Sequence, residues 1–273
     1  MISGEGGYKG IWGDGFRYLE ALVHGVLRTI FLNYFDIRTK GLDHIPKDGP
    51  AIIAGNHPSL IDGLLLYLIT PRPIRFIIHK ELYEHPLLHW VMKGMDFLPA
   101  QVGRHALDAA IDALKRGQAL CIFPEGDAYD EGRMESLHQG LGVLALRTGA
   151  PVVPLGISGS DIAYPMGTWL PKPGPIALLF QAPVRYPLEK GAIEVGELVV
   201  VLADCRERIL EAATLASIMC LVPRQRDWLR MGVAAIPLLA LVAGLSATAP
   251  PGSLKPGGSP ARERNGQRPR APA

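Results

Sequence analysis

The chain has 273 residues, 48% of them hydrophobic, and a formal net charge of +2 at pH 7. This length favours one compact domain of about 180 residues with flanking segments over two equal domains. Its three cysteines, Cys121, Cys205 and Cys220, are too few for a disulfide framework or a zinc site, which indicates a reducing, cytoplasmic location. The basic residues show no aromatic interleaving, so nothing in the composition points to a nucleic-acid partner.

The first predicted helix covers residues 16–36, where apolar residues recur at spacings of three and four. This apolar stripe consists of Leu19, Leu22, Val23, Val26, Leu27, Ile30, Phe31 and Tyr34. Arg17, His24 and Arg28 lie off the stripe. Such a helix either packs on the domain core or lies in a membrane interface, and we take residues 1–37 as a membrane-associating region. The glycine-rich start lacks the apolar core and cleavage site of a secretion signal.

Short apolar runs and helical patterns alternate through residues 38–222, which we take as the central domain. The strand-like runs are 51–55, 74–78, 119–123, 152–157 and 176–180, and the helical patterns are 107–116 and 140–147. This alternation predicts an α/β fold, with a mostly parallel sheet flanked by helices.

The carboxyl end is organised differently. A helix is predicted over about 194–218, and the basic cluster Arg224-Gln225-Arg226 then leads into residues 231–249, which carry no charge. At about 1.5 Å per residue an uncharged helix of this length would reach about 28 Å. The alternatives are a membrane span, a re-entrant or interfacial segment, and packing on the domain, and we take 223–249 as a hydrophobic membrane-associated segment. Residues 250–273 are rich in Pro, Gly and Arg, which predicts a disordered basic tail.

One motif in the central domain combines a histidine with a carboxylate: Asn56-His57-Pro58-Ser59-Leu60-Ile61-Asp62. On a single helix, residues five apart point about 140° away from each other, so a plain helix cannot pair them. The proline pushes the residue before it towards extended conformations and suits a helix start. We therefore expect His57 in the turn before a helix that begins near Pro58, with Asp62 in its second turn. The carboxylate could then orient one imidazole nitrogen and leave the other to take a proton from a hydroxyl.

A second motif, Phe123-Pro124-Glu125-Gly126, follows the apolar run 119–122. The carboxyl ends of strands in an open α/β sheet are where such folds place ligand-binding groups. Because His57 and Glu125 both follow predicted strands, we expect them to converge at one edge of the sheet.

On these residues the chain resembles the glycerolipid acyltransferases of the 1-acylglycerol-3-phosphate acyltransferase type. Four blocks occur in the expected order: Asn56-His57 to Asp62, Gly94-Met95-Asp96-Phe97, Phe123-Pro124-Glu125-Gly126 and Val153-Pro154-Leu155. Supporting matches are Gly41-Leu42-Asp43-His44-Ile45-Pro46 and Lys80-Glu81-Leu82, and coverage runs from about residue 38 to about 185. The resemblance implies that His57 removes a proton from the acceptor's hydroxyl, which attacks the thioester of acyl-CoA or acyl carrier protein. Asp62 would orient and charge the histidine.

The resemblance also implies a substrate-binding set beside the two catalytic residues. This set comprises Asn56, Gly94, Phe97, Phe123, Pro124, Glu125, Gly126, Arg104 and Arg133. Two arginines that are thought to grip the acceptor's phosphate in the family are replaced by Ala100 and by Asp127-Ala128. Arginine is the natural bidentate partner of phosphate, so these departures weaken the case for a phosphomonoester acceptor. Arg104 and Arg133 either substitute for them or are solvated surface arginines.

Together these observations predict a membrane-associated acyltransferase of phospholipid biosynthesis, with its catalytic domain on the cytoplasmic face. Its partners would be a lysolipid acceptor, acyl-CoA or acyl carrier protein, and a membrane surface. No cofactor is expected beyond the acyl donor, and no metal, because His85 and His89 lack the His-Glu-x-x-His pattern. The alternatives are transfer to another lysolipid, a transacylase, a lipid hydrolase, and a catalytically silent lipid-binding protein.

Overall fold

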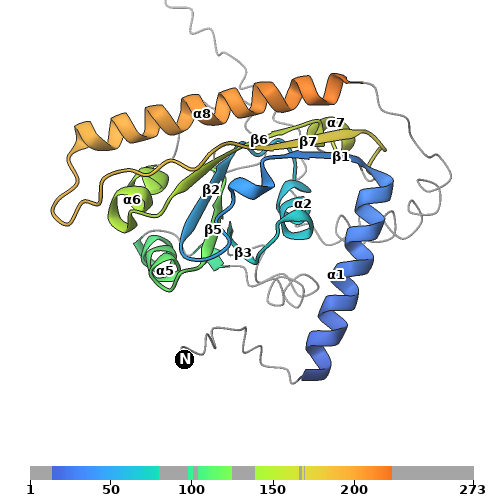
Figure 1. Cartoon of the computed structure of the whole chain (residues 1–273), viewed down its shortest axis with the longest axis horizontal. Coiled ribbons are helices and arrows are strands. Elements are labelled where there is room, and N and C mark those ends of the chain that lie inside the picture. The colour runs from blue at the N-terminus through green and yellow to red at the C-terminus, as the bar shows by residue number, and fades with distance from the viewer. Residues whose placement is uncertain are drawn as a thin grey trace, which may run out of the picture.

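A computed structural model describes residues 14–79, 98–100, 104–124, 139–165, 168 and 170–222. Over these residues the chain forms one seven-stranded sheet covered by helices on both faces (Figure 1). The strands are β1 (Asp36–Lys40), β2 (Ala51–Gly55), β3 (Ile74–His79), β4 (Leu98–Ala100), β5 (Ala119–Ile122), β6 (Val152–Ser158) and β7 (Pro175–Phe180). All five predicted strands are confirmed, each to within one residue at either end.

The sheet has the strand order β1-β7-β6-β2-β5-β3-β4. Each neighbouring pair runs parallel except β6 and β7, which are antiparallel. The prediction of a mostly parallel sheet is therefore confirmed. Since β2 and β5 are adjacent and parallel, their carboxyl ends lie at the same edge of the sheet.

Helices supply the two outer layers. They are α1 (Asp14–Tyr34), the 3-10 turn η1 (Leu42–His44), α2 (Asp62–Ile69), α5 (Arg104–Lys115), α6 (Gln139–Thr148), α7 (Ser160–Ala163) and α8 (Val195–Leu221). The start of α8 is set by a capping box, in which Glu194 and Glu197 each accept a hydrogen bond from the other's backbone N–H. The four helices predicted with both ends, 16–36, 107–116, 140–147 and 194–218, are all present, with bounds that shift by up to about three residues.

The core has two halves because side chains of a strand alternate between the faces of a sheet. Ala51 and Ile53 of β2 pack with α1 and α2, whereas Ile52 and Ala54 pack with α5, α6 and α8. Every residue of β2 is buried. This burial on both faces explains why β2 reads as a continuous apolar run rather than an alternating one.

Helix α8 approaches the sheet unusually closely at Gly156 of β6. A Cβ atom at this position would lie 2.0 Å from the carbonyl carbon of Ala212 and 2.2 Å from the amide nitrogen of Ala213. The backbone of α8 therefore occupies the space that any side chain at residue 156 would need.

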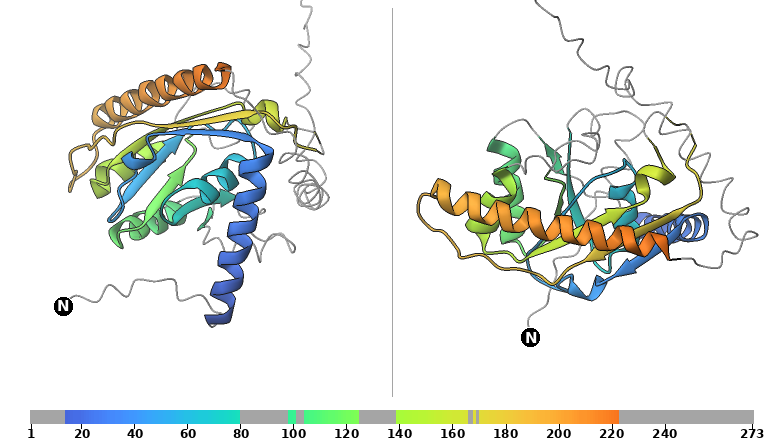
Figure 2. Two further views of the ribbon diagram at one scale, coloured as in Figure 1. Left: turned by 45° about the vertical axis from the view of Figure 1, so that its right-hand side comes forward. Right: turned by 90° about the horizontal axis from the view of Figure 1, so that it is seen from above.

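Helix α1 packs only in part and extends beyond the sheet (Figure 2). Phe31 and Tyr34 near its carboxyl end are buried in the core, whereas Leu22 and Val26 are 63% and 49% exposed. Two of the polar residues off the stripe face the domain, since His24 Nε2 contacts the Tyr67 carbonyl and Arg28 Nε donates to the Leu68 carbonyl at the end of α2. Packing on the domain is thus confirmed for the carboxyl end of the stripe, and association of the exposed part with a membrane interface stays a prediction. One end packs, and the other leaves apolar side chains on the surface.

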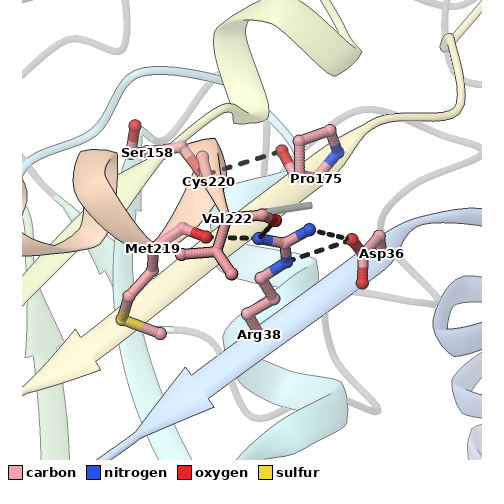
Figure 3. Close-up of polar contacts among 7 residues, drawn as sticks. All are labelled: Asp36, Arg38, Ser158, Pro175, Met219, Cys220 and Val222. Carbon is pink, nitrogen blue, oxygen red and sulfur yellow. Dashed lines mark hydrogen bonds and ion pairs between the residues drawn. The ribbon is translucent and has the colours of Figure 1, made fainter. Parts of the chain in front are cut away.

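The end of α8 is fastened to the edge strand β1 (Figure 3). Arg38 donates hydrogen bonds to the carbonyls of Met219 and Val222 and pairs with Asp36. A guanidinium at the carboxyl end of a helix satisfies carbonyls that have no partner within the helix.

Among the described residues no helix combines the length and apolar content needed to cross a membrane. The segments 223–249 and 250–273 lie outside the described residues, so the predictions for them stay predictions.

Candidate active site

The turn between β2 and α2 carries the predicted catalytic pair. The prediction that a helix begins near Pro58, with Asp62 in its second turn, is wrong: Asp62 is the first residue of α2. Residues 59–62 close a turn first, in which the Asp62 N–H donates to the Ser59 carbonyl at 3.1 Å. The Asp62 carboxylate in turn accepts the Ser59 N–H at 2.8 Å, so this side chain completes the turn that leads into the helix.

His57 and Asp62 are paired as predicted. His57 Nδ1 lies 3.0 Å from Asp62 Oδ2, the same oxygen that accepts the Ser59 N–H. The Asp62 side chain is fully buried, whereas the His57 side chain is 16% exposed. The other carboxylate oxygen, Oδ1, is buried and has no hydrogen-bond partner among the described residues. A carboxylate on Nδ1 fixes the imidazole tautomer and orientation, so proton exchange with a substrate falls to Nε2.

Phe123 lies directly against the His57 imidazole. Its ring stacks on that of His57, with centroids 3.9 Å apart and planes 13° from parallel. This contact follows from the sheet, because Ala54 of β2 pairs with Ile122 of β5 and each ring comes shortly after its strand. The predicted convergence of the two motifs is therefore present for Phe123. Pro124 beside it is buried, while Glu125 and Gly126 lie outside the described residues.

Asn56 and Ser59 make contacts that the sequence did not predict. The Asn56 side-chain amide donates to the Ile157 carbonyl at 2.8 Å and accepts the Ile157 N–H at 2.7 Å. The Ser59 hydroxyl donates to the Tyr164 carbonyl at 3.0 Å. Asn56, predicted to bind substrate, thus uses both polar atoms of its side chain on β6. The partners lie 101 and 105 residues along the chain, a separation at which no spacing rule operates.

The thiol closest in sequence to the Phe123 motif is Cys121 of β5. Burial raises the pKa of this thiol, and the negative charge of Asp62 raises it further. A fully buried cysteine with a raised pKa remains a neutral thiol, which is a poor nucleophile. Cys121 is therefore a packing residue beneath the site.

Of the remaining predicted site residues, the structure describes only Arg104. Arg104 is the first residue of α5, shortly after Ala100 ends β4, which places its backbone towards the carboxyl edge of the sheet. Gly94, Phe97 and Arg133 lie outside the described residues, as do His85 and His89. No group of three His, Cys, Asp or Glu side chains suited to a metal ion occurs in the part of the chain that the structure describes.

Known proteins are similar to this chain over the region that contains the His57–Asp62 turn. The family model described as acyltransferase matches residues 36–158, from the start of β1 to the end of β6, and includes the whole His57–Asp62 turn. Over these residues the chain is similar to the acyltransferase family. The crystal structure of the 1-acyl-sn-glycerophosphate acyltransferase PlsC from Thermotoga maritima superimposes on this chain with a TM-score of 0.61 and 26% sequence identity. That match covers 79% of this chain and 86% of PlsC.

Two curated relatives illustrate the range of similarity. The chloroplastic 1-acyl-sn-glycerol-3-phosphate acyltransferase of Arabidopsis thaliana is 30% identical over 143 residues, which is 50% of this chain and 39% of that protein. An uncharacterized protein of Mycobacterium tuberculosis is 32% identical over 170 residues, which is 56% of this chain and 45% of that protein. The chain thus spans less than half the length of either relative.

Proposed function

We propose that this acyltransferase transfers a fatty acyl group from the thioester of acyl-CoA or acyl carrier protein to a hydroxyl of a lysolipid. The observation that carries the proposal is the 3.0 Å contact between His57 Nδ1 and the buried Asp62 carboxylate. A histidine held in this way is a general base, of a kind typically worth about 10² to 10⁴ in rate.

The reaction needs one proton acceptor and one leaving thiol. His57 Nε2 takes the proton of the lysolipid hydroxyl as its oxygen attacks the thioester carbonyl. The carbon–sulfur bond then breaks, an ester forms, and the departing sulfur receives the proton from His57. Asp62 favours the positively charged imidazole between these steps and keeps Nε2 directed at the reacting oxygen.

Direct transfer is favoured over a covalent acyl-enzyme by the nucleophiles near His57. The Ser59 hydroxyl donates its proton to the Tyr164 carbonyl, and the Cys121 thiol is fully buried with a raised pKa. Neither group is held by a base as a serine or cysteine nucleophile would be.

The first acceptor to test is lysophosphatidic acid. The names of the Arabidopsis relative and of PlsC support it. Against it stands Ala100, at a position where the family usually has an arginine that grips phosphate. Arg104, at the amino end of α5, is the nearby cation that could replace this grip.

The proposal includes a membrane surface, with the acyltransferase domain on its cytoplasmic face and no cofactor beyond the acyl donor. A lysolipid resides in a bilayer, and the exposed Leu22 and Val26 give α1 an apolar surface that faces away from the domain. The apolar segment 231–249 and the basic tail would add to this attachment.

The proposal is tested by incubating the purified full-length protein with radiolabelled acyl-CoA or acyl carrier protein and a panel of lysolipids. We expect label in a diacyl lipid only when donor and acceptor are both present, and a preference for one head group. Label that appears only as free fatty acid, at equal rates with and without acceptor, would identify a hydrolase and contradict the proposal.

A further inference from the structure

We infer that Asn56 and Ser59 are positioning residues, which hold the catalytic turn against the end of β6 and the residue after α7 so that His57 and Asp62 keep their reactive geometry. The inference rests on the proposed function of His57, but its contacts and one of its tests do not depend on activity. In this inference neither residue takes part in proton or acyl transfer, and both act through His57 and Asp62.

The Asn56 side chain makes the two hydrogen bonds to β6 that the backbone of one more β2 residue would make. The ladder between β2 and β6 ends with the pair Gly55 and Leu155. Beyond it the backbone of β2 turns away, while β6 continues to Ser158. The Asn56 amide fills the vacated place, because it both donates to the Ile157 carbonyl and accepts from the Ile157 N–H. An asparagine side chain carries one such donor and acceptor, in the arrangement that a peptide group presents.

Ser59 fastens the other end of the turn. Its side chain is almost fully buried, and its hydroxyl donates to the Tyr164 carbonyl just after α7. Its backbone N–H donates to Asp62 Oδ2, the oxygen that also contacts His57. A shift of Ser59 would therefore move a hydrogen-bond donor of the catalytic carboxylate.

His57 lies between these two attachments. Both attachments lead to the short segment from Ile157 to Tyr164 that contains α7 and lies at the end of β6 (Figure 1). Releasing either one frees the turn at one side of the imidazole and leaves buried polar groups unpaired. A displacement of about 1 Å in a catalytic group can lower the rate by about 10²-fold.

The test compares Asn56→Ala, Ser59→Ala and the double variant with wild type. We expect each single variant to lower kcat by about 10-fold or more, while KM for the acyl donor changes little. Because both residues hold the same turn, the double variant should lose less than the product of the single effects. Asn33→Ala is the matched control, since its amide also donates to a backbone carbonyl, that of Thr29, but this hydrogen bond is exposed and lies within α1.

Two further readouts separate positioning from stability alone. Asn56→Asp keeps the shape but turns an oxygen towards the Ile157 carbonyl, so we expect a lower kcat than in the wild type at every pH where the protein is folded. The NMR signals of the His57 ring report its contact with Asp62 even in a protein that transfers no acyl group. Unchanged His57 signals and wild-type kcat in folded Asn56→Ala would overturn the inference. If the wild-type protein transfers no acyl group but the His57 signals of Asn56→Ala differ from those of wild type, the positioning role stands and only the proposed function is contradicted.

Discussion

The His57 imidazole lies between the buried Asp62 carboxylate at its Nδ1 atom and the Phe123 ring stacked on its face. The spacing of His57 and Asp62 around a proline predicts their contact, because the proline forces a turn between strand and helix. The start of α2 could not be predicted to the residue, since it depends on the Asp62 carboxylate accepting the Ser59 N–H. The partners of Asn56 and Ser59 lie 101 and 105 residues later in the sequence, so only the folded structure shows these contacts.

Asp204 gives a residue-scale prediction about pH. Hydrogen bonds from Arg208 lower the pKa of this carboxyl below its ordinary value of 3.8, and a hydrogen bond from Tyr186 adds to the effect. A lowered folded-state pKa stabilises the fold above the unfolded value, and that stability is lost as the pH falls below 3.8 through the folded value. Since the pair is more than a third exposed, the contribution is less than about 1 kcal/mol.

We therefore expect Asp204→Asn to flatten the dependence of the unfolding free energy on pH below about 4. Urea titrations of wild type and variant between neutral and acid pH measure it. Asp108→Asn, an exposed change on α5, serves as the control. Parallel pH curves for Asp204→Asn and wild type would show that the Arg208 contact does not stabilise the fold.

Elements were predictable where burial leaves a clear pattern. The five apolar strands are central or covered on both faces, and their runs of Val, Ile and Leu mark them. β1 was missed because Asp-Ile-Arg-Thr-Lys carries three charges, as edge strands commonly do, and β4 because it has only three residues. β1 also pairs with β7, whose sequence lies far away, so no local signal marks it.

The contact between α8 and β6 gives a prediction at this scale. Gly156→Ala would place a methyl group inside the backbone of α8, so we expect it to lower the unfolding free energy by about 1–3 kcal/mol or more. Gly25→Ala is the matched control, because that helical glycine has nothing within 4 Å of its built Cβ and alanine favours a helix by about 0.5–1 kcal/mol. Chemical denaturation measures both, and a Gly156→Ala variant as stable as wild type would refute the close packing.

Over the whole molecule, the packed sheet positions the site and α1 extends away from it (Figure 2). The exposed apolar residues Leu22 and Val26 lie on this extension, while Val199 and Val200, which are also exposed, lie in the first turns of α8. Figure 1 places the amino end of α8 on the opposite side of the sheet from α1. A single membrane-facing surface should therefore include the first pair and not the second.

We expect Leu22→Ser with Val26→Ser to weaken binding to anionic phospholipid vesicles by roughly tenfold or more, because two apolar side chains lose their burial in the bilayer. Val199→Ser with Val200→Ser removes a similar apolar area elsewhere and should leave binding unchanged. Cosedimentation with vesicles of defined composition compares the two. Equal loss in both variants, or none in the first, would exclude α1 as the attachment surface.

The central claim is that His57, oriented by Asp62, activates the acceptor hydroxyl. The most direct measurement is kcat for acyl transfer from acyl-CoA to a lysolipid in His57→Ala, beside a His44→Ala control whose imidazole hydrogen-bonds to the Phe180 carbonyl instead of to a carboxylate. We predict a loss of about 10²-fold or more in folded His57→Ala and a value near wild type in His44→Ala. A folded His57→Ala protein that transfers acyl groups at the wild-type rate would contradict the account.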